Sequence, residues 1–158
     1  MNFDQLNIHN PLKNAIADLG LFETTPIQEQ AFPVIMSGSD VIGIAQTGTG
    51  KTFAYLLPLL RMFKFSKSPH PRILILVPTR ELVLQVADEA EKLSSYMSFE
   101  VGRAYGGTNI QTQKDIIFNG LDLMVATPGR LLDHVSQNSI DLSRVEFLVL
   151  DEADRMLD

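Results

Sequence analysis

The chain carries one sequence whose residue types and spacing suit phosphate binding: Ala45-Gln46-Thr47-Gly48-Thr49-Gly50-Lys51-Thr52. Gly48 and Gly50 have no Cβ atom, so the backbone can bend there and come close to a ligand. Successive backbone N–H groups then point into one concavity, and a helix that follows adds the positive end of its dipole. Lys51 would reach the β- and γ-phosphates of a nucleotide, and the Thr52 hydroxyl is placed for a Mg²⁺ ion. Ala45 stands where the P-loop pattern has Gly.

Two adjacent acids, Asp151 and Glu152, follow the last aliphatic run of the chain. A P-loop enzyme needs a carboxylate for Mg²⁺ at the end of such a strand, which is where Asp151 lies. Glu152 projects in another direction and could accept a proton from a water that attacks the γ-phosphate. The alternative is an exposed acidic turn. For Asp154 and Arg155, a salt bridge or a loop-to-loop contact is as good an interpretation as catalysis.

The phosphate-binding sequence is flanked by two apolar runs that predict the elements needed to position it. The β-branched run Val41–Ile44 predicts a strand, and Phe53–Leu60 has the length of a helix. A strand, a Gly-rich turn and a helix form the setting in which such a loop holds phosphate. The alternative, a Gly/Thr-rich connection before a buried helix, is disfavoured because Gly-Lys-Thr opens the helix. Pro58 predicts a kink or an early end near Leu57.

The composition describes a globular protein. The 158 residues are enough for one domain, with 45% hydrophobic and 20% charged residues. The absence of cysteine excludes disulfides, zinc–thiolate sites and thiol catalysis. The three histidines lie far apart, without ligand spacing. We find no signal peptide and no apolar run long enough to cross a membrane, so we expect a cytoplasmic protein.

The remaining chain alternates apolar runs with amphipathic stretches. We predict strands at 73–77, 101–105, 123–126 and 147–150. Helices are predicted from Asn10-Pro11 to Gly20, from Thr25-Pro26 to about Ser37, from Thr79 to about Ser94, from Thr108 to Phe118 and from Thr127 to Val135. This alternation predicts an α/β domain with a mainly parallel central sheet and helices on both faces.

Four predicted strands are each followed at once by a polar string. The strings are Gln46-Thr47-Gly48, Pro78-Thr79-Arg80, Thr127-Pro128-Gly129-Arg130 and Asp151-Glu152. In a parallel sheet the carboxyl ends of the strands lie along one edge, and ligands bind there. We therefore expect residues separated by more than a hundred positions to meet at one site, with Lys51 and Asp151 on the same side of the molecule.

Six motifs in this order resemble the DEAD-box RNA helicases, specifically their first RecA-like domain. They are Thr25-Pro26-Ile27-Gln28, Ala45 to Thr52, Pro78-Thr79-Arg80-Glu81-Leu82, Gly106-Gly107, Thr127-Pro128-Gly129-Arg130 and Asp151-Glu152-Ala153-Asp154. The resemblance covers nearly the whole chain and implies a P-loop NTPase fold of the RecA-like kind. It divides the chain into a Q-motif region for adenine recognition, residues 1–38, and a P-loop core, residues 39–158.

The resemblance implies an ATP site and an RNA site. Gln28, with Thr25, would recognise adenine, and Phe3 would support that segment. Ala45 to Thr52 would hold the phosphates, Thr52 and Asp151 would hold Mg²⁺, and Lys51, Asp151 and Glu152 would carry catalysis. The path of the RNA backbone would be lined by Pro78, Thr79, Arg80, Gly106, Gly107, Thr127, Pro128, Gly129 and Arg130.

The formal net charge of −6 argues against a broad basic surface. An acidic chain is an unexpected RNA-binding protein, but the resemblance explains it. The family binds RNA phosphates through backbone N–H groups, helix starts and a few arginines, and these contacts do not depend on the base. The 2′-hydroxyl contacts would distinguish RNA from DNA.

The family continues beyond the acidic motif with a Ser-Ala-Thr segment and a second RecA-like domain, whereas this chain ends at Asp158. We therefore expect a fragment of a longer enzyme, with the second domain as a partner in the same polypeptide. The Ser-Ala-Thr strand lies, in this class, between the phosphate-loop strand and the strand of Asp151. Without it we expect a slot in the sheet with unpaired backbone groups.

Three functions fit these motifs. The first is an ATP-driven RNA helicase or remodelling enzyme. The second is an ATP-gated RNA clamp that anchors other proteins, with hydrolysis as a timer. The third is an unrelated P-loop ATPase, which Gln28 and the Thr-Pro-Gly-Arg string speak against.

Overall fold

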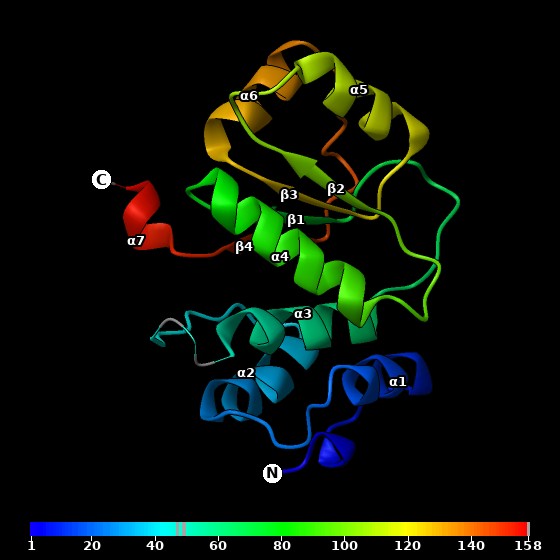
Figure 1. Ribbon diagram of the computed structural model, residues 1–158, viewed down its shortest axis with the longest axis vertical. Coiled ribbons are helices and arrows are strands. Elements are labelled where there is room, and N and C mark those ends of the chain that lie inside the picture. Colours follow the sequence, from blue (N-terminus) through cyan, green and yellow to red (C-terminus); the bar gives the residue numbers. More distant parts are fainter. Residues whose placement is uncertain (47, 49, 158) are drawn as a thin grey trace. The chain divides into compact units, whose positions relative to one another are not determined.

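The computed structural model describes residues 1–46, 48 and 50–157, and it has an α/β architecture (Figure 1). The elements in chain order are η1 (Phe3–Gln5), α1 (Asn10–Asp18), α2 (Pro26–Met36), α3 (Lys51–Met62), β1 (Ile73–Leu76), α4 (Arg80–Leu93), β2 (Val101–Ala104), α5 (Ile110–Asn119), β3 (Leu123–Ala126), α6 (Pro128–Ser136), β4 (Phe147–Leu150) and α7 (Ala153–Met156). The chain divides into two compact units. Unit 1 contains residues 1–65 and 89–98, and unit 2 contains residues 66–88 and 99–158.

Unit 1 is built from helices. Helix α2 packs along α3, and α1 contacts both α3 and η1. Its apolar core includes the fully buried side chains of Leu12, Leu56 and Leu60. On α3 the buried leucines recur because one side of this helix is apolar.

Helix α3 does not end at Leu57, so the early end expected from Pro58 is wrong, and the kink stays a prediction. The helix continues through Pro58 to Met62. Proline removes one backbone hydrogen bond, but Pro58 and the leucines on either side of it, Leu57 and Leu59, are all buried. The burial of this apolar stretch outweighs the lost bond.

The strand expected at Val41–Ile44 is absent, so this prediction was wrong. Residues 39–46 form neither helix nor strand, and the side chains of Ile42 and Ile44 are 94% and 93% exposed. The β-branched residues favour an extended chain, but a strand also needs a neighbour to pair with. Within the described residues, no strand pairs with this segment.

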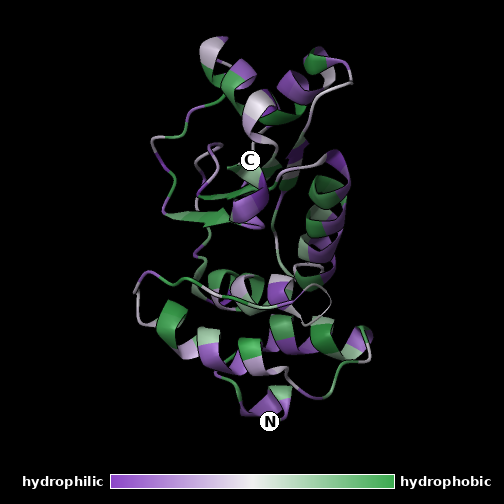
Figure 2. Cartoon of the chain, turned by 90° about the vertical axis from the view of Figure 1, so that its left-hand side faces the viewer, coloured by the Kyte–Doolittle hydropathy of each residue, from purple (hydrophilic) through white to green (hydrophobic). Residues whose placement is uncertain are grey.

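Unit 2 contains a four-stranded sheet in the order β2-β3-β1-β4, and all of its pairs are parallel. The register sets Ile73 of β1 opposite Leu123 of β3 and Phe147 of β4. The predicted parallel sheet is therefore confirmed. Its short strands are drawn mostly in the hydrophobic colour in Figure 2, as expected for the central strands β1 and β3, which are covered on both faces.

Helices cover both faces of this sheet. On one face, Leu74, Met124 and Ala104 pack with Ile117 of α5 and Leu131 of α6. On the other face, a salt bridge links α4 to β2, because the Arg103 guanidinium donates to the Asp88 carboxylate at 2.7 Å. Arg103 lies level with Val125 and Ile75, which are fully buried. Residues 80–88 of α4 thus lie on the face opposite α5 and α6.

Strand β4 lies at one edge of the sheet, and its outward-facing leucines are uncovered. Leu148 and Leu150 are 59% and 53% exposed, whereas their neighbours on β1, Leu74 and Leu76, pack against the α5/α6 side. A further strand beside β4, which the Ser-Ala-Thr expectation calls for, stays a prediction.

Two helix starts differ by one residue from the sequence prediction. His9, rather than Asn10, is the N-cap of α1. Asn109, rather than Thr108, caps α5, because the Asn109 side chain accepts a hydrogen bond from the Gln111 N–H at 2.9 Å. Across the described part of the chain, no helix combines the length and the hydropathy that a membrane crossing requires.

Candidate functional site

In unit 1 the phosphate-binding sequence leads directly into α3. Gly48 and Gly50 both have positive φ values, +85° and +80°, which alanine or a larger residue would adopt only with strain. Gly50 is the N-cap of the 12-residue helix α3, and Lys51 and Thr52 are its first two residues. The helix start and the two glycines match the arrangement expected for a phosphate cradle. Thr47 and Thr49 of the predicted site lie outside the described residues.

Gln28 of α2 connects its own motif to this loop. Its side chain is only 4% exposed; its Oε1 accepts from the Thr25 N–H at 2.9 Å, and its Nε2 donates to the Gly50 carbonyl at 3.1 Å. A Cβ atom built at Gly50 would lie 2.9 Å from the Thr25 hydroxyl and closer still to the Gln28 amide nitrogen. Only glycine fits at position 50, because both the φ angle and the space require it.

The other predicted residues of the ATP site in unit 1 lie at the start of the chain and before the loop. Phe3 is buried in η1, and its N–H donates to the Phe22 carbonyl at 3.1 Å. Ala45 and Gln46 lie in the irregular segment before the loop. Phe3 therefore supports the segment around Phe22 structurally.

In unit 2 the carboxyl ends of the four strands form one continuous edge. Backbone hydrogen bonds cross this edge just beyond the strands, at 3.0 Å in each case: Thr127 N–H to Ala104 O, Val77 N–H to Ala126 O and Asp151 N–H to Leu76 O. The predicted site residues of this unit all follow a strand end here: Pro78, Thr79 and Arg80 after β1; Gly106 and Gly107 after β2; Thr127, Pro128, Gly129 and Arg130 after β3; Asp151 and Glu152 after β4. We call this set the carboxyl edge.

At the carboxyl edge, the start of α4 is held by two contacts. The Thr79 hydroxyl accepts from the Leu82 N–H at 3.2 Å, which caps the helix. The guanidinium of Arg80 lies over the ring of Tyr105, 5.0 Å from its centroid, in a cation–π contact. Tyr105 was not among the predicted site residues; its position directly before Gly106-Gly107 was the available signal.

The guanidinium of Arg130 is held between α6 and the loop after β2. Its Nη2 donates to the Thr108 carbonyl at 3.2 Å and its Nη1 to Gln113 Oε1 at 3.4 Å. Its Nε lies 3.5 Å from the Asp133 carboxylate, and the side chain is 11% exposed. Gln113 also accepts from His134 at 3.0 Å, and both of these residues are buried. Nothing in the sequence pattern singled out Gln113 or His134.

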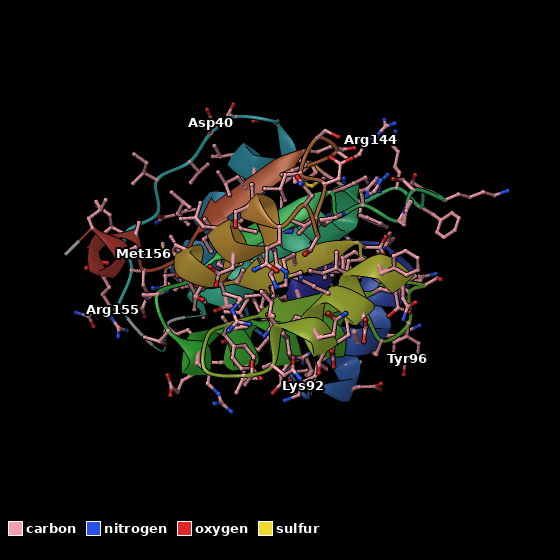
Figure 3. All side chains as sticks on the ribbon, turned by 90° about the horizontal axis from the view of Figure 1, so that it is seen from above. Asp40, Lys92, Tyr96, Arg144, Arg155 and Met156 are labelled. Carbon is pink, nitrogen blue, oxygen red and sulfur yellow. The ribbon has the colours of Figure 1, made fainter. Side chains whose placement is uncertain are left out.

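The two acids after β4 differ in their surroundings. Asp151 is buried, with 7% exposure. Glu152 has a positive φ of 55°, an uncommon conformation for a residue with a side chain. Its carboxylate pairs with Arg155 Nη1 at 2.6 Å, so Arg155 makes the salt bridge that was one of its predicted roles. Arg155 projects from α7 in Figure 3.

The residues expected for catalysis are divided between the units. Lys51 and Thr52 belong to unit 1, and Asp151 and Glu152 belong to unit 2. Their meeting in one ATP site stays a prediction.

Comparison with known proteins decides the family. The family model described as "DEAD/DEAH box helicase" matches residues 25–158. The chain belongs to this family. All of the predicted site residues except Phe3 lie within the matched range, and the resemblance drawn from the six motifs is confirmed. An unrelated P-loop ATPase is thereby excluded.

Named relatives of this DEAD/DEAH box family member are ATP-dependent RNA helicases. The chain is 47% identical over 156 residues to "ATP-dependent RNA helicase DeaD" of Mycobacterium tuberculosis strain H37Rv. It is 44% identical over 159 residues to "ATP-dependent RNA helicase SrmB" of Escherichia coli K12. These alignments cover 98% and 99% of the chain but only 28% and 36% of the two relatives.

The fold of the family member also matches a solved structure. A crystal structure of a hypothetical ATP-dependent RNA helicase from Sulfolobus tokodaii superposes with a TM-score of 0.84 at 38% sequence identity. The match covers 93% of this chain and 42% of that chain. The predicted α/β fold of the RecA-like kind is therefore confirmed.

Proposed function

We propose that the chain is the first RecA-like domain of an ATP-dependent RNA helicase. In the full-length protein it binds ATP with Mg²⁺ and the RNA backbone. A second RecA-like domain of the same polypeptide closes on both ligands, separates a short stretch of duplex and opens again after hydrolysis. The greater length of the named relatives, of which this chain covers about a third, is consistent with a second domain.

Gln28 is proposed to select ATP. Among the described residues, its amide makes one hydrogen bond with the Thr25 N–H and one with the Gly50 carbonyl. These two bonds fix which end of the amide is oxygen, and they leave one N–H and one lone pair for the edge of adenine. Because the same side chain donates a hydrogen bond to the Gly50 carbonyl, the residue that would recognise adenine is in direct contact with the phosphate loop.

The phosphates are proposed to bind to the loop from Ala45 to Thr52. The positive φ values of Gly48 and Gly50 and the start of α3 after them fit a bound anion. Lys51 neutralises charge on the β- and γ-phosphates. Mg²⁺, a hard cation that prefers oxygen ligands, would be held by the Thr52 hydroxyl and the Asp151 carboxylate and would stabilise the charge that develops on the phosphates.

Glu152 is proposed as the general base. Its carboxylate would accept a proton from the attacking water once its hydrogen bond with Arg155 has broken. The base must come within hydrogen-bond distance of that water. Asp151, which is more buried, holds the metal rather than the proton.

RNA is proposed to lie along the part of the carboxyl edge that follows β1, β2 and β3. This proposal depends most on one observation: residues from three separate stretches follow these parallel strands to the same edge. They present the starts of α4 and α6, the exposed Gly106-Gly107 turn and the arginines Arg80 and Arg130. Such groups bind phosphate and sugar without reading bases, which suits a chain with a net charge of −6.

Two variants of the full-length protein test the ATPase assignment. Lys51→Ala should abolish ATP binding or turnover. Glu152→Gln should bind ATP normally but hydrolyse it about 10²–10⁴-fold more slowly, the usual cost of losing a positioned base. Binding is measured with a fluorescent ATP analogue and turnover by phosphate release with and without RNA. Normal turnover by Glu152→Gln would show that the base is another group.

The second candidate function, an ATP-gated RNA clamp, shares all of these residues. A strand-displacement assay on a short RNA duplex separates the two. Unwinding that requires ATP supports the helicase, and RNA retention by ATP without unwinding supports the clamp.

A further inference from the structure

Gln113 is a buried polar residue that none of the six motifs contains. It lies on α5 with 6% exposure. Its Nε2 donates to the Tyr105 carbonyl and to the Thr108 hydroxyl, both at 3.0 Å. Its Oε1 accepts from Arg130 Nη1 at 3.4 Å and from His134 Nε2 at 3.0 Å. Both N–H groups and both lone pairs of one amide are therefore used.

This arrangement determines the orientation of the amide. With its oxygen and nitrogen exchanged, Gln113 would set its oxygen against the Tyr105 carbonyl and its N–H groups against Arg130. Neither contact would be a hydrogen bond, because each would join two acceptors or two donors. A single side chain thus ties the loop after β2 to helix α6.

The orientation also determines the proton on His134. The Gln113 oxygen only accepts, so His134 Nε2 carries the hydrogen. His134 Nδ1 is buried with no hydrogen-bond partner among the described residues, and in the neutral ring it is the nitrogen without a hydrogen. Burial, and after it the positive charge of Arg130, lowers the pKa of His134. His134 is a neutral donor that helps to hold the Gln113 oxygen toward Arg130.

Arg130 is restrained at both terminal nitrogens. One N–H of Nη2 bonds the Thr108 carbonyl and one N–H of Nη1 bonds Gln113. Counting contacts among the described residues, each terminal nitrogen keeps one further N–H. The plane of the guanidinium is therefore fixed before a ligand arrives, and little side-chain entropy is left to lose on binding.

We propose that Gln113 is a positioning residue for RNA: it holds Arg130 and the Tyr105–Thr108 loop in one fixed arrangement, so that both contact the same stretch of RNA backbone. The inference rests on the proposed RNA site. His134 assists by holding the amide. Gln113 itself touches no RNA, since it is buried beneath the loop.

The test measures RNA affinity of the full-length protein for a labelled single-stranded RNA with a non-hydrolysable ATP analogue, at several salt concentrations. Gln113→Leu removes all four bonds with little change of volume. Its affinity should fall about tenfold to a hundredfold, the value of a lost charge-assisted contact. The slope of log K against log salt should fall by about 0.7, which is one phosphate contact in a single strand.

Two control variants come from the same helix. Gln111→Leu makes the same substitution at an exposed residue, whose amide bonds only Asp115 among the described contacts, and it should bind RNA as the wild type does. Ile117→Ala removes a buried side chain that packs against the sheet, so it destabilises the fold but leaves the Gln113 contacts in place. Its RNA affinity and salt slope should also match those of the wild type.

The double variant with Arg130→Ala shows whether Gln113 acts through Arg130. If it does, the loss in Gln113→Leu/Arg130→Ala is smaller than the product of the two single losses. Gln113→Glu keeps an acceptor for Arg130 but loses both bonds to the loop. Gln113→Glu should keep the wild-type salt slope but bind RNA more weakly. It tests the proposal in place of Gln113→Leu if that variant does not fold.

Three results would each overturn a conclusion. Wild-type RNA affinity and salt slope in Gln113→Leu, with weakened binding in Arg130→Ala, would refute the positioning role alone. Wild-type affinity in Arg130→Ala would refute the proposed RNA site itself. Equal losses in Gln113→Leu and Ile117→Ala would reduce Gln113 to a stabilising residue and would also refute the positioning role.

Discussion

The contact between Gln28 and the phosphate loop predicts that two neighbouring glycines differ in their tolerance of alanine. Gly48 and Gly50 have nearly the same φ, +85° and +80°. A Cβ at Gly48 meets nothing within 4 Å, whereas a Cβ at Gly50 overlaps the Gln28 amide and lies 2.9 Å from the Thr25 hydroxyl. Gly48→Ala is therefore a matched control for Gly50→Ala.

The magnitude follows from two terms. Alanine at positive φ costs about 1–2 kcal/mol in either variant. In Gly50→Ala the Gln28 side chain must also move, which breaks its bond to the Gly50 carbonyl and costs about 0.5–1.5 kcal/mol, or more if a buried polar atom stays unpaired. Gly50→Ala should thus lower the local stability by about 1–2 kcal/mol more than Gly48→Ala does.

Hydrogen exchange of the full-length protein without nucleotide measures this difference. Exchange in peptides from α2 and the start of α3 should be about 5–30-fold faster in Gly50→Ala than in Gly48→Ala. Adding Gln28→Ala to Gly50→Ala removes the overlap with the Gln28 amide, so the two losses should not add. Equal exchange in the two alanine variants, or full additivity with Gln28→Ala, would refute the contact.

Two further predictions concern unit 2. Tyr105→Leu should weaken RNA binding about 2–5-fold in fluorescence anisotropy, whereas Tyr105→Phe should not, because Arg80 rests on the ring and not on the hydroxyl; equal loss in both variants would contradict this. Burial, and after it the positive charges of Arg130 and Lys114, lower the pKa of His134 below its ordinary 6.5, and Asp133 opposes them only in part. As the pH falls, His134 is therefore protonated in the unfolded chain before it is protonated in the folded one. The free energy of unfolding should therefore drop below about pH 6.5 in the wild type, and His134→Gln should drop less in urea titrations between pH 5 and 8; parallel pH profiles would contradict the assignment.

The strands and helices of unit 2 could be predicted from local sequence. Three of its four strands, β1, β3 and β4, are short apolar runs, whereas β2 contains Gly102 and Arg103; turn residues or helix caps follow each strand. The parallel pairing also followed from the alternation of strands and helices. The strand predicted at Val41–Ile44 is absent because its β-branched residues indicate only a preference for extended backbone. They do not show whether another strand lies beside it to pair with.

The motifs predicted most of the proposed site but not the residues that contact it. Tyr105 and Gln113 contact Arg80 and Arg130, which lie 25 and 17 positions away in the chain. Glutamine on an amphipathic helix has no distinguishing pattern when its partners are unknown. Gln28 is an intermediate case: its motif could be recognised in the sequence, but its hydrogen bond to Gly50 could not be predicted.

The sequence by itself determined the family, the order of the motifs and, for the motifs of unit 2, the edge of the sheet at which they lie, because these depend on residue types, periodicity and the geometry common to parallel sheets. Only the tertiary structure decided which side chains hold the site residues in place. A hydrogen bond between Gln28 and Gly50, or one between Gln113 and Arg130, requires atoms within about 3 Å. Such distances are set by the packing of whole helices and strands, and no local pattern records them.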